Sequence, residues 1–288
     1  MSKENKFETN AIHVGNKPDS STGSISPPIH LTSTYVQDGI GKNKGFDYSR
    51  GTNPTRERLE KNIASLEGGH DAIAFSSGMA ATTALLQHLK QGDHIIISRK
   101  VYGGTYRMTT QVLSNHGLKF DFVDTTDAQN IKEAIKPETK WVFIETPTNP
   151  MLEVTDIAAV SKICKESNIK FAVDNTFMSP FGQRPIEHGA DCVMHSTTKF
   201  IGGHSDVLGG VLVAKDKELS DKLHFIQKSG GAIPSPFDAW LLLRSVKTLG
   251  MRVQKASDNA MVIAKYFDSN SKIAKTIYPG LESHPQNS

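Results

Sequence analysis

The sequence predicts an α/β fold, in which helices cover both faces of a large, mostly parallel sheet. Short apolar runs recur from Ala72 onward, and stretches with helical periodicity separate most of them. Parallel strands require such crossover helices, and they are buried on both faces. The composition agrees, because 37% of the 288 residues are hydrophobic and 22% are charged. These values are typical of a globular protein and exclude a disordered chain.

The expected elements alternate after Asn53. A helix over Pro54–Leu66 has proline in its first turn and apolar residues at helical spacing, and Gly68 and Gly69 follow it. Four further helices are expected. The first ends at Leu89, the second ends near Asn115, and the other two span 128–135 and 154–167. Strands are expected over 72–75, 94–98, 120–123, 141–144, 171–173 and 192–194, with one more apolar segment over 207–214.

The first fifty residues differ from the rest in composition. Residues 1–50 are rich in Gly, Pro, Ser and Thr, and segments such as 23–28 and 38–44 cannot hold a regular helix. Aromatic and basic residues still punctuate this region, so it is not a low-complexity segment. We therefore expect residues 1–50 to form an extended N-terminal arm.

Charge and cysteine content exclude several classes of protein. The net charge of +3 is dispersed, so neither nucleic acid nor a membrane surface is an expected partner. No apolar run approaches the roughly 18 residues of a membrane span, and the N-terminus lacks a secretory signal. Cys164 and Cys192 are too few for a disulfide framework or a zinc site and fit a reducing cytoplasm. The histidines His88, His195 and His204 lack metal-ligand spacing, so no metal site is expected.

Chemically useful side chains follow several of the predicted strands. In a parallel α/β sheet, ligands bind beyond the carboxyl ends of the strands. In chain order these positions carry the Ser76–Met79 turn, Tyr102, Glu145 with Asn149, Asp174, and Lys199 with Ser196 and Thr198. They amount to an anion cradle, an aromatic ring, carboxylates and an amine.

Pyridoxal phosphate requires such a set. Its aldehyde needs a lysine, its ring nitrogen needs a carboxylate, and its phosphate needs main-chain amides and hydroxyls. Each residue alone also has an ordinary explanation: Lys199 as a solvated loop lysine, Asp174 and Ser77 as helix caps, and Tyr102 as a packing residue. The prediction depends on the whole set occurring in order.

Sequence motifs that run nearly from end to end carry a family resemblance. They are Tyr48-Ser49-Arg50, Asn53–Arg56, Ser76–Ala80, Val101–Thr105, Glu145–Pro150, Val173–Phe177, His195–Lys199 and Gly203–Asp206. With these motifs the chain resembles the cysteine/methionine-metabolism family of pyridoxal-phosphate enzymes. The resemblance implies the aspartate-aminotransferase fold (fold type I), with 51–245 as the cofactor-binding domain. It also implies that 246–288 begin a smaller C-terminal domain that is incomplete here.

The resemblance also implies the roles of the site residues. Lys199 would be the Schiff-base lysine and proton shuttle, Asp174 the partner of the ring nitrogen, and Tyr102 the stacked ring. The phosphate would contact Gly78, Met79, Ser196 and Thr198, together with Tyr48 and Arg50 reaching over from a neighbouring subunit. Asn149 would contact the ring hydroxyl with support from Glu145, and Arg107 and Glu145 would face the substrate.

The implied reaction is the γ-elimination of L-cystathionine to cysteine, 2-oxobutanoate and ammonia. The stretch Gly230–Trp240 is similar to the cystathionine γ-lyases, and Gly104 stands where methionine γ-lyases usually carry cysteine. The alternatives are γ-replacement, as in a cystathionine γ-synthase or an O-acyl-homoserine sulfhydrylase, and a non-catalytic cofactor-binding product. The expected partner is a further copy of the chain, in a dimer or tetramer with shared sites. An incomplete C-terminal domain would lack the arginine that grips the substrate carboxylate, so slow turnover is expected.

Overall fold

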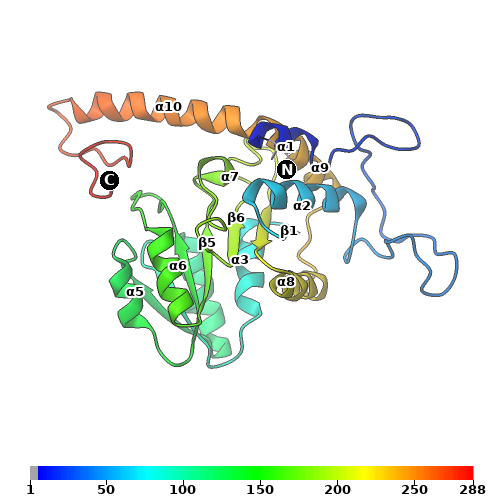
Figure 1. Cartoon of the computed structure of the whole chain (residues 1–288), viewed down its shortest axis with the longest axis horizontal. Coiled ribbons are helices and arrows are strands. Elements are labelled where there is room, and N and C mark those ends of the chain that lie inside the picture. The colour runs from blue at the N-terminus through cyan, green and yellow to red at the C-terminus, as the bar shows by residue number, and fades with distance from the viewer. Residues whose placement is uncertain (1–5, 288) are drawn as a thin grey trace, which may run out of the picture. The chain divides into compact units, whose positions relative to one another are not determined.

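The computed structural model describes residues 6–287, and Figure 1 traces the chain. Seven strands form a sheet in the order β1-β7-β6-β5-β4-β2-β3. The chain divides into two compact units, Met1–His88 with Cys192–Leu249, and Leu89–Asp191 with Gly250–Ser288. None of the helices in residues 6–287 combines the length and the apolarity that crossing a bilayer requires.

The first unit contains strands β1, β6 and β7. Strand β7 runs antiparallel to both β1 and β6, with Ile73 and Met194 each paired with Leu212. All three strands are mainly apolar, and all their residues except Asp71 are buried, because helices of the same unit pack against them. The elements are α1 (Phe7–His13), α2 (Pro54–Glu67), β1 (Asp71–Phe75), α3 (Gly78–Gln87), β6 (Cys192–His195), β7 (Gly210–Ala214), α8 (Lys217–Gly230), α9 (Pro236–Ser245) and the 3-10 turn Val246–Thr248.

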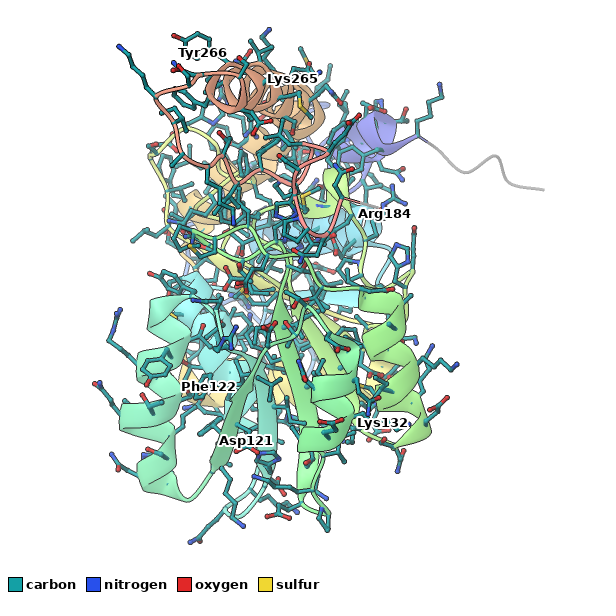
Figure 2. The ribbon with its side chains drawn as sticks, turned by 90° about the vertical axis from the view of Figure 1, so that its left-hand side faces the viewer. Asp121, Phe122, Lys132, Arg184, Lys265 and Tyr266 are labelled. Atoms are coloured by element: carbon teal, nitrogen blue, oxygen red, sulfur yellow. The ribbon has the colours of Figure 1, made fainter. Side chains whose placement is uncertain are left out.

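The second unit contains four parallel strands, in the order β5-β4-β2-β3. The side chains of β3 alternate: Phe122 packs against Tyr106, with ring centroids 5.1 Å apart, whereas Asp121 pairs with Lys136. Phe122 and Asp121 are labelled in Figure 2. The elements are β2 (His94–Ser98), α4 (Gly103–Arg107), β3 (Lys119–Val123), α5 (Ala128–Ala134), β4 (Thr139–Glu145), α6 (Ile157–Glu166), β5 (Lys170–Asp174) and α7 (Ser179–Gly182), with most of α10 (Leu249–Asp268).

Short polar side chains set where several helices begin. Asn53 caps α2, accepting hydrogen bonds from the amides of Thr55 (2.9 Å) and Arg56 (3.4 Å), and Pro54 occupies the first turn. Asp156 caps α6 by accepting from the amide of Ala159 at 3.0 Å. This cap explains why α6 begins at Ile157, three residues later than the sequence predicts, because the capping residue itself is not helical.

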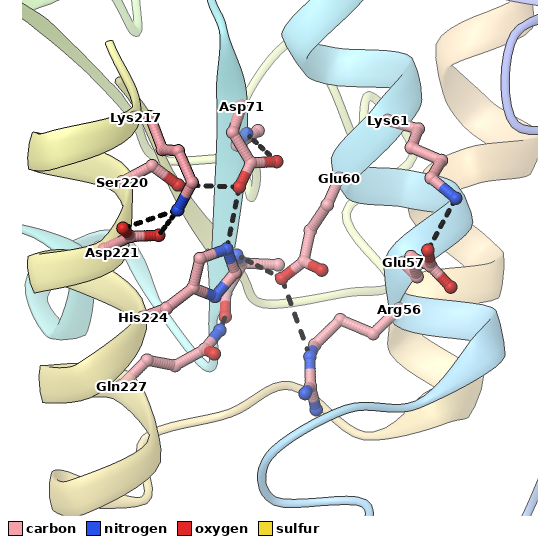
Figure 3. A network of polar contacts seen from close by, with 12 residues as sticks. Arg56, Glu57, Glu60, Lys61, Asp71, Lys217, Ser220, Asp221, His224 and Gln227 are labelled. Atoms are coloured by element: carbon pink, nitrogen blue, oxygen red, sulfur yellow. Dashed lines mark hydrogen bonds and ion pairs between the residues drawn. The ribbon is translucent and has the colours of Figure 1, made fainter. Parts of the chain in front are cut away.

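A polar network in the first unit holds the edge strand β1 (Figure 3). The amide of Ala74 donates to Glu60 of α2 at 2.9 Å, and Gln227 of α8 donates to the Ala74 carbonyl at 2.5 Å. At the start of β1, Asp71 accepts hydrogen bonds from Ser220 (2.7 Å) and from His224 (2.8 Å). These side chains satisfy main-chain groups that an edge strand would otherwise leave open.

The structure confirms the α/β class and the mostly parallel sheet, with β7 as the antiparallel exception. It also contains a helix that the sequence did not predict, α1, within the expected arm. The Asn62 side chain of α2 accounts for it, because its Nδ2 donates to the carbonyls of Asn10, Ala11 and Val14 at 2.8–3.2 Å. A tertiary contact of this kind leaves no local pattern. After α1, residues 15–52 lack helices and strands apart from an isolated bridge between Thr34 and Tyr48.

The helix expected to end near Asn115 changes its winding. α4 ends at Arg107, and a π-helical segment (Met108–Val112) and a 3-10 turn (Leu113–His116) continue it. The hydroxyl of Thr109 donates to the carbonyls of Thr105 and Tyr106, and that of Thr110 also donates to Tyr106. Such side chains compete with the amides for helical carbonyls, which accounts for the irregular winding.

Candidate active site

The first unit carries a tight turn at the start of α3. Ser77 caps this ten-residue helix by accepting from the amide of Ala80 at 3.1 Å. Within the described residues, no hydrogen-bond acceptor faces the amides of Gly78 and Met79. Unpaired amides at a helix N-terminus form an anion site, which a phosphate fits.

Gly78 lies against the turn that follows β6. A Cβ atom at position 78 would come within 2.7 Å of the Ser196 Cβ and 2.9 Å of its Oγ. Gly210 lies even closer to the turn before α3, because a Cβ atom at position 210 would come within 2.1 Å of the Ser77 carbonyl oxygen. The structure therefore brings together Gly78 and Ser196, two of the predicted phosphate contacts. A side chain larger than that of glycine would not fit at position 78 or at position 210.

Lys199 lies in the turn after β6 and is exposed. Its main chain is fixed, since its amide donates to Ser196 and its carbonyl accepts from Gly203 at 2.7 Å. Within residues 6–287 its amine has no hydrogen-bond or ion-pair partner. The hydroxyl of Thr198 accepts a hydrogen bond from the amide of Gly209, the residue directly before β7, at 3.1 Å. The lysine thus has a fixed backbone and an available amine.

The second unit carries a pair of buried carboxyl groups. Glu145 ends β4 and Asp174 ends β5, and the two residues are register partners on parallel strands. Each is 5% exposed. Burial of the carboxyl and the charge of Asp174 raise the pKa of Glu145 to about 8. Burying two ionised carboxyl groups side by side costs free energy unless a cation lies between them. A protonated ring nitrogen would supply that cation.

Tyr102 and Asn149 lie on two loops that Glu145 connects. The amide of Tyr102 donates to Glu145 Oε2 at 2.7 Å, and the amide of Asn149 donates to Oε1 at 3.0 Å. Both side chains are exposed. Arg107 ends α4, one turn from Tyr102, and its guanidinium has no carboxylate partner within the described part of the chain. It remains available to a substrate carboxylate.

Tyr48 and Arg50 lie in the irregular segment before α2. The guanidinium of Arg50 lies over the Tyr48 ring, 5.4 Å from its centroid, and Arg50 Nη1 donates to the carbonyl of Lys228. Both side chains are exposed. Their expected reach to a neighbouring subunit stays a prediction.

The second unit also contains supporting groups that the sequence did not reveal. A chain of hydroxyls joins Ser98 to Thr125 (3.0 Å) and Thr125 to Thr155 (2.8 Å), and Ser98 Oγ accepts from the amide of Glu145 at 3.2 Å. Gln183 links the loops after β4 and β5, because its Nε2 donates to the Thr146 carbonyl and to Asn175 Oδ1. Isolated Ser, Thr and Gln residues carry no motif that could have pointed to these roles.

Each unit by itself contains residues that suit one part of pyridoxal phosphate. The unpaired amides of Gly78 and Met79 suit its phosphate, and the Glu145–Asp174 pair suits its protonated ring nitrogen. The residues that would hold it are those predicted from the strand tips, with the amine of Lys199 available to its aldehyde.

Comparison with known proteins identifies the family. The chain is 50% identical over 280 residues to the "Probable cystathionine gamma-synthase" of Herpetosiphon aurantiacus, covering 97% of this chain and 88% of that protein. It is 45% identical to the cystathionine beta-lyase of Coxiella burnetii, covering 99% of this chain and 74% of the relative. The crystal structure of cystathionine gamma-lyase from Lactobacillus plantarum, complexed with L-serine, matches with a TM-score of 0.96 and 43% identity, over 98% of this chain and 74% of that one.

The three relatives carry three different names, a γ-synthase, a β-lyase and a γ-lyase, so they agree on trans-sulfuration chemistry but not on one reaction. The family model of the Cys/Met metabolism PLP-dependent enzymes matches residues 8–288, which is nearly the whole chain. The chain therefore belongs to the Cys/Met metabolism PLP-dependent enzyme family, whose cofactor is pyridoxal phosphate.

Proposed function

We propose that the chain catalyses the γ-elimination of L-cystathionine to cysteine, 2-oxobutanoate and ammonia. The observation that supports lyase chemistry is the exposed amine of Lys199 on a fixed turn, whose residue Ser196 lies against Gly78 at the start of α3. The choice of γ-elimination is supported by the Gly230–Trp240 stretch, which resembles the γ-lyases. In this structure the Gly230–Trp240 stretch lies beside the turn between β1 and α3, because the carbonyl of Ala232 accepts a hydrogen bond from the amide of Ser76 at 3.0 Å.

Each of four side chains has a separate role in the proposed reaction. Bound pyridoxal phosphate supplies an electron-withdrawing ring conjugated to the substrate Cα. Asp174 would hold a proton at the ring nitrogen, and Tyr102 would hold the ring by stacking against it. Lys199 would take the proton from the substrate Cα and then one from Cβ, so that the Cγ–S bond breaks and the thiolate leaves with the bonding electrons. The thiolate would gain a proton to become cysteine, and one water would convert the remaining carbons to 2-oxobutanoate and ammonia. Arg107 orients the distal carboxylate through a two-point contact.

We further propose that the site is completed by a second copy of the chain. The segment before α2 exposes apolar side chains that have no buried environment of their own: Ile25 (80% exposed), Leu31 (73%), Val36 (89%) and Ile40 (105%). Tyr48 and Arg50 lie on the same segment and offer a hydroxyl and a guanidinium suited to a phosphate. A partner subunit would cover the apolar groups and receive these two donors.

Steady-state assays with competing substrates test the proposal. The purified chain loaded with pyridoxal phosphate should release 2-oxobutanoate from cystathionine faster than it condenses an O-acyl-homoserine with cysteine. Release of pyruvate instead would assign β-elimination, and no turnover would support the non-catalytic alternative. In the same assay, mixing Arg50→Ala and Lys199→Ala chains should restore activity if the site is shared. No recovery in confirmed dimers would place the whole site within one chain.

A further inference from the structure

One buried carboxyl group connects two loops of the second unit. Glu145 Oε2 accepts from the amide of Tyr102 at 2.7 Å, and Oε1 accepts from the amide of Asn149 at 3.0 Å. We call these two hydrogen bonds the Glu145 bridge. The loops are 43 and four residues away from Glu145 in sequence, so the bridge joins segments that the chain itself does not hold together.

The loops at the two ends of the bridge present exposed side chains. Tyr102 is 48% exposed and stands directly before α4, and Asn149 is also exposed. Glu145 itself is only 5% exposed. Since a buried group fixes two exposed ones through their main chains, the orientation of both side chains depends on where its carboxyl lies.

The position of this carboxyl is well determined. Its strand, β4, is paired on both sides, with β2 and with β5. The amide of Glu145 donates to Ser98 Oγ at 3.2 Å, and the hydroxyls of Thr125 and Thr155 continue that chain. Burial and the charge of Asp174 raise the pKa of Glu145 to about 8, so the carboxyl also responds to charge placed near Asp174.

We propose that Glu145 is a positioning residue that sets the Tyr102 ring and the Asn149 amide before the cofactor binds. It acts through these two residues and not as a substrate contact, because each of its oxygens already accepts a main-chain amide. The proposal deepens the proposed function and depends on it for the identity of the cofactor. The bridge itself can be tested without any cofactor.

Two variants change the Glu145 bridge, and a third serves as the control. Glu145→Gln keeps the shape but offers one acceptor and one donor, so the Gln amino group must oppose one of the two amides. Glu145→Asp keeps the charge, but its shorter side chain cannot reach both loops. Glu166→Gln makes the same chemical change at an exposed position at the end of α6 and serves as the control.

Amide hydrogen exchange of the full, cofactor-free chain tests the bridge. In Glu145→Gln, protection of the Tyr102 or Asn149 amide should fall on the order of tenfold, the usual effect of losing a buried hydrogen bond. Glu145→Asp should behave similarly, and the amides of β4 and all those of Glu166→Gln should be unchanged. Unchanged protection in Glu145→Gln, or wild-type protection in Glu145→Asp, would overturn the bridge.

Titration with pyridoxal phosphate then tests positioning. Both Glu145 variants should bind the cofactor about tenfold more weakly and change the visible circular dichroism of the bound ring, which reports its protein surroundings. A loosened bridge with an unchanged dichroism spectrum would overturn the positioning role. If the wild-type chain itself bound no pyridoxal phosphate, the proposed function would fail, and the exchange data would still decide whether the bridge exists.

Discussion

At the scale of single residues, the two carboxyl groups at the ends of β4 and β5 are the most informative feature. The sequence predicted that Glu145 and Asp174 follow strands that are successive along the chain, because each comes directly after a short apolar run. It could not predict that they are register partners, since register depends on the pairing of strands that are distant in sequence. Likewise it predicted Tyr102 and Asn149 as site residues but not the hydrogen bonds that link them to Glu145.

The carboxyl pair predicts how the stability of the cofactor-free chain varies with pH. The pKa of Glu145 is raised from 4.5 to about 8 in the folded chain, so the folded state favours the protonated form. Ionisation then costs stability as the pH rises from 4.5 towards 8. Asp174→Asn removes one of the two causes, and the fall of the unfolding temperature over this pH range should become shallower.

Thermal unfolding at a series of pH values measures this effect. Asp258→Asn, on the exposed surface of α10, is the matched control and should keep the wild-type slope. An Asp174→Asn chain with the wild-type slope would show that the Asp174 charge does not act on Glu145.

At the scale of secondary-structure elements, local signals determined what could be predicted. Pro54 and the glycines after it predicted the position of α2. The apolar runs predicted six of the strands to within two residues, and the seventh, β7, lies in the segment 207–214 that was expected only to be apolar. The sequence did not give the π-helical segment after α4 or the antiparallel direction of β7. The former depends on hydroxyls that compete for carbonyls, and the latter on connections whose path no local pattern reports.

The contact between β1 and α8 predicts a second pH effect. Burial lowers the pKa of His224, but its hydrogen bond to Asp71 and the charges of Glu60 and Asp71 outweigh burial, and the net pKa is raised above 6.5. For Asp71, burial raises the pKa, but the hydrogen bonds from His224 and Ser220 and the His224 charge lower it below 3.8 overall. The pair therefore stabilises the fold fully between about pH 4 and 6.5, and the contribution is lost as the pH rises through the folded pKa of His224.

His224→Gln keeps a hydrogen-bond donor and removes the charge. Because the pair is partly exposed, solvent screening limits its contribution to roughly 1 kcal/mol, or about 2–4 °C in unfolding temperature. The loss should be seen near pH 6 and should shrink near pH 9. Lys217→Gln breaks the exposed Lys217–Asp221 pair on the same helix (Figure 3) and should show no such difference between the two pH values. An equal loss at both pH values for His224→Gln would mean that the charge of His224 contributes nothing.

At the scale of the whole molecule, the order of motifs along the chain carried the prediction. Each candidate residue had an ordinary explanation alone, but the set follows successive strands, and strand ends are where α/β sheets bind ligands. The family match over residues 8–288 confirms the fold type and the cofactor. The proposed domain boundaries at 50 and 245 and the sharing of sites between subunits stay predictions. They depend on contacts that no local sequence pattern contains.

The directions of the strands also explain why one particular lysine should carry the cofactor. Lys199 and Lys215 both follow strands of the first unit, β6 and β7, and both are exposed. Because β7 runs antiparallel to β6, their carboxyl ends lie at opposite edges of the sheet. Only Lys199 stands beside Ser196 and the unpaired amides at the start of α3.

Borohydride reduction of the chain loaded with pyridoxal phosphate tests this claim most directly. Reduction should fix the cofactor on the peptide that contains Lys199, and peptide mass spectrometry should locate it there. Lys215→Ala should be labelled like the wild type, and Lys199→Ala should bind the cofactor only reversibly, without a fixed label. Label on any other lysine of the wild-type chain, or full labelling of Lys199→Ala, would contradict the assignment of Lys199 and with it the proposed site.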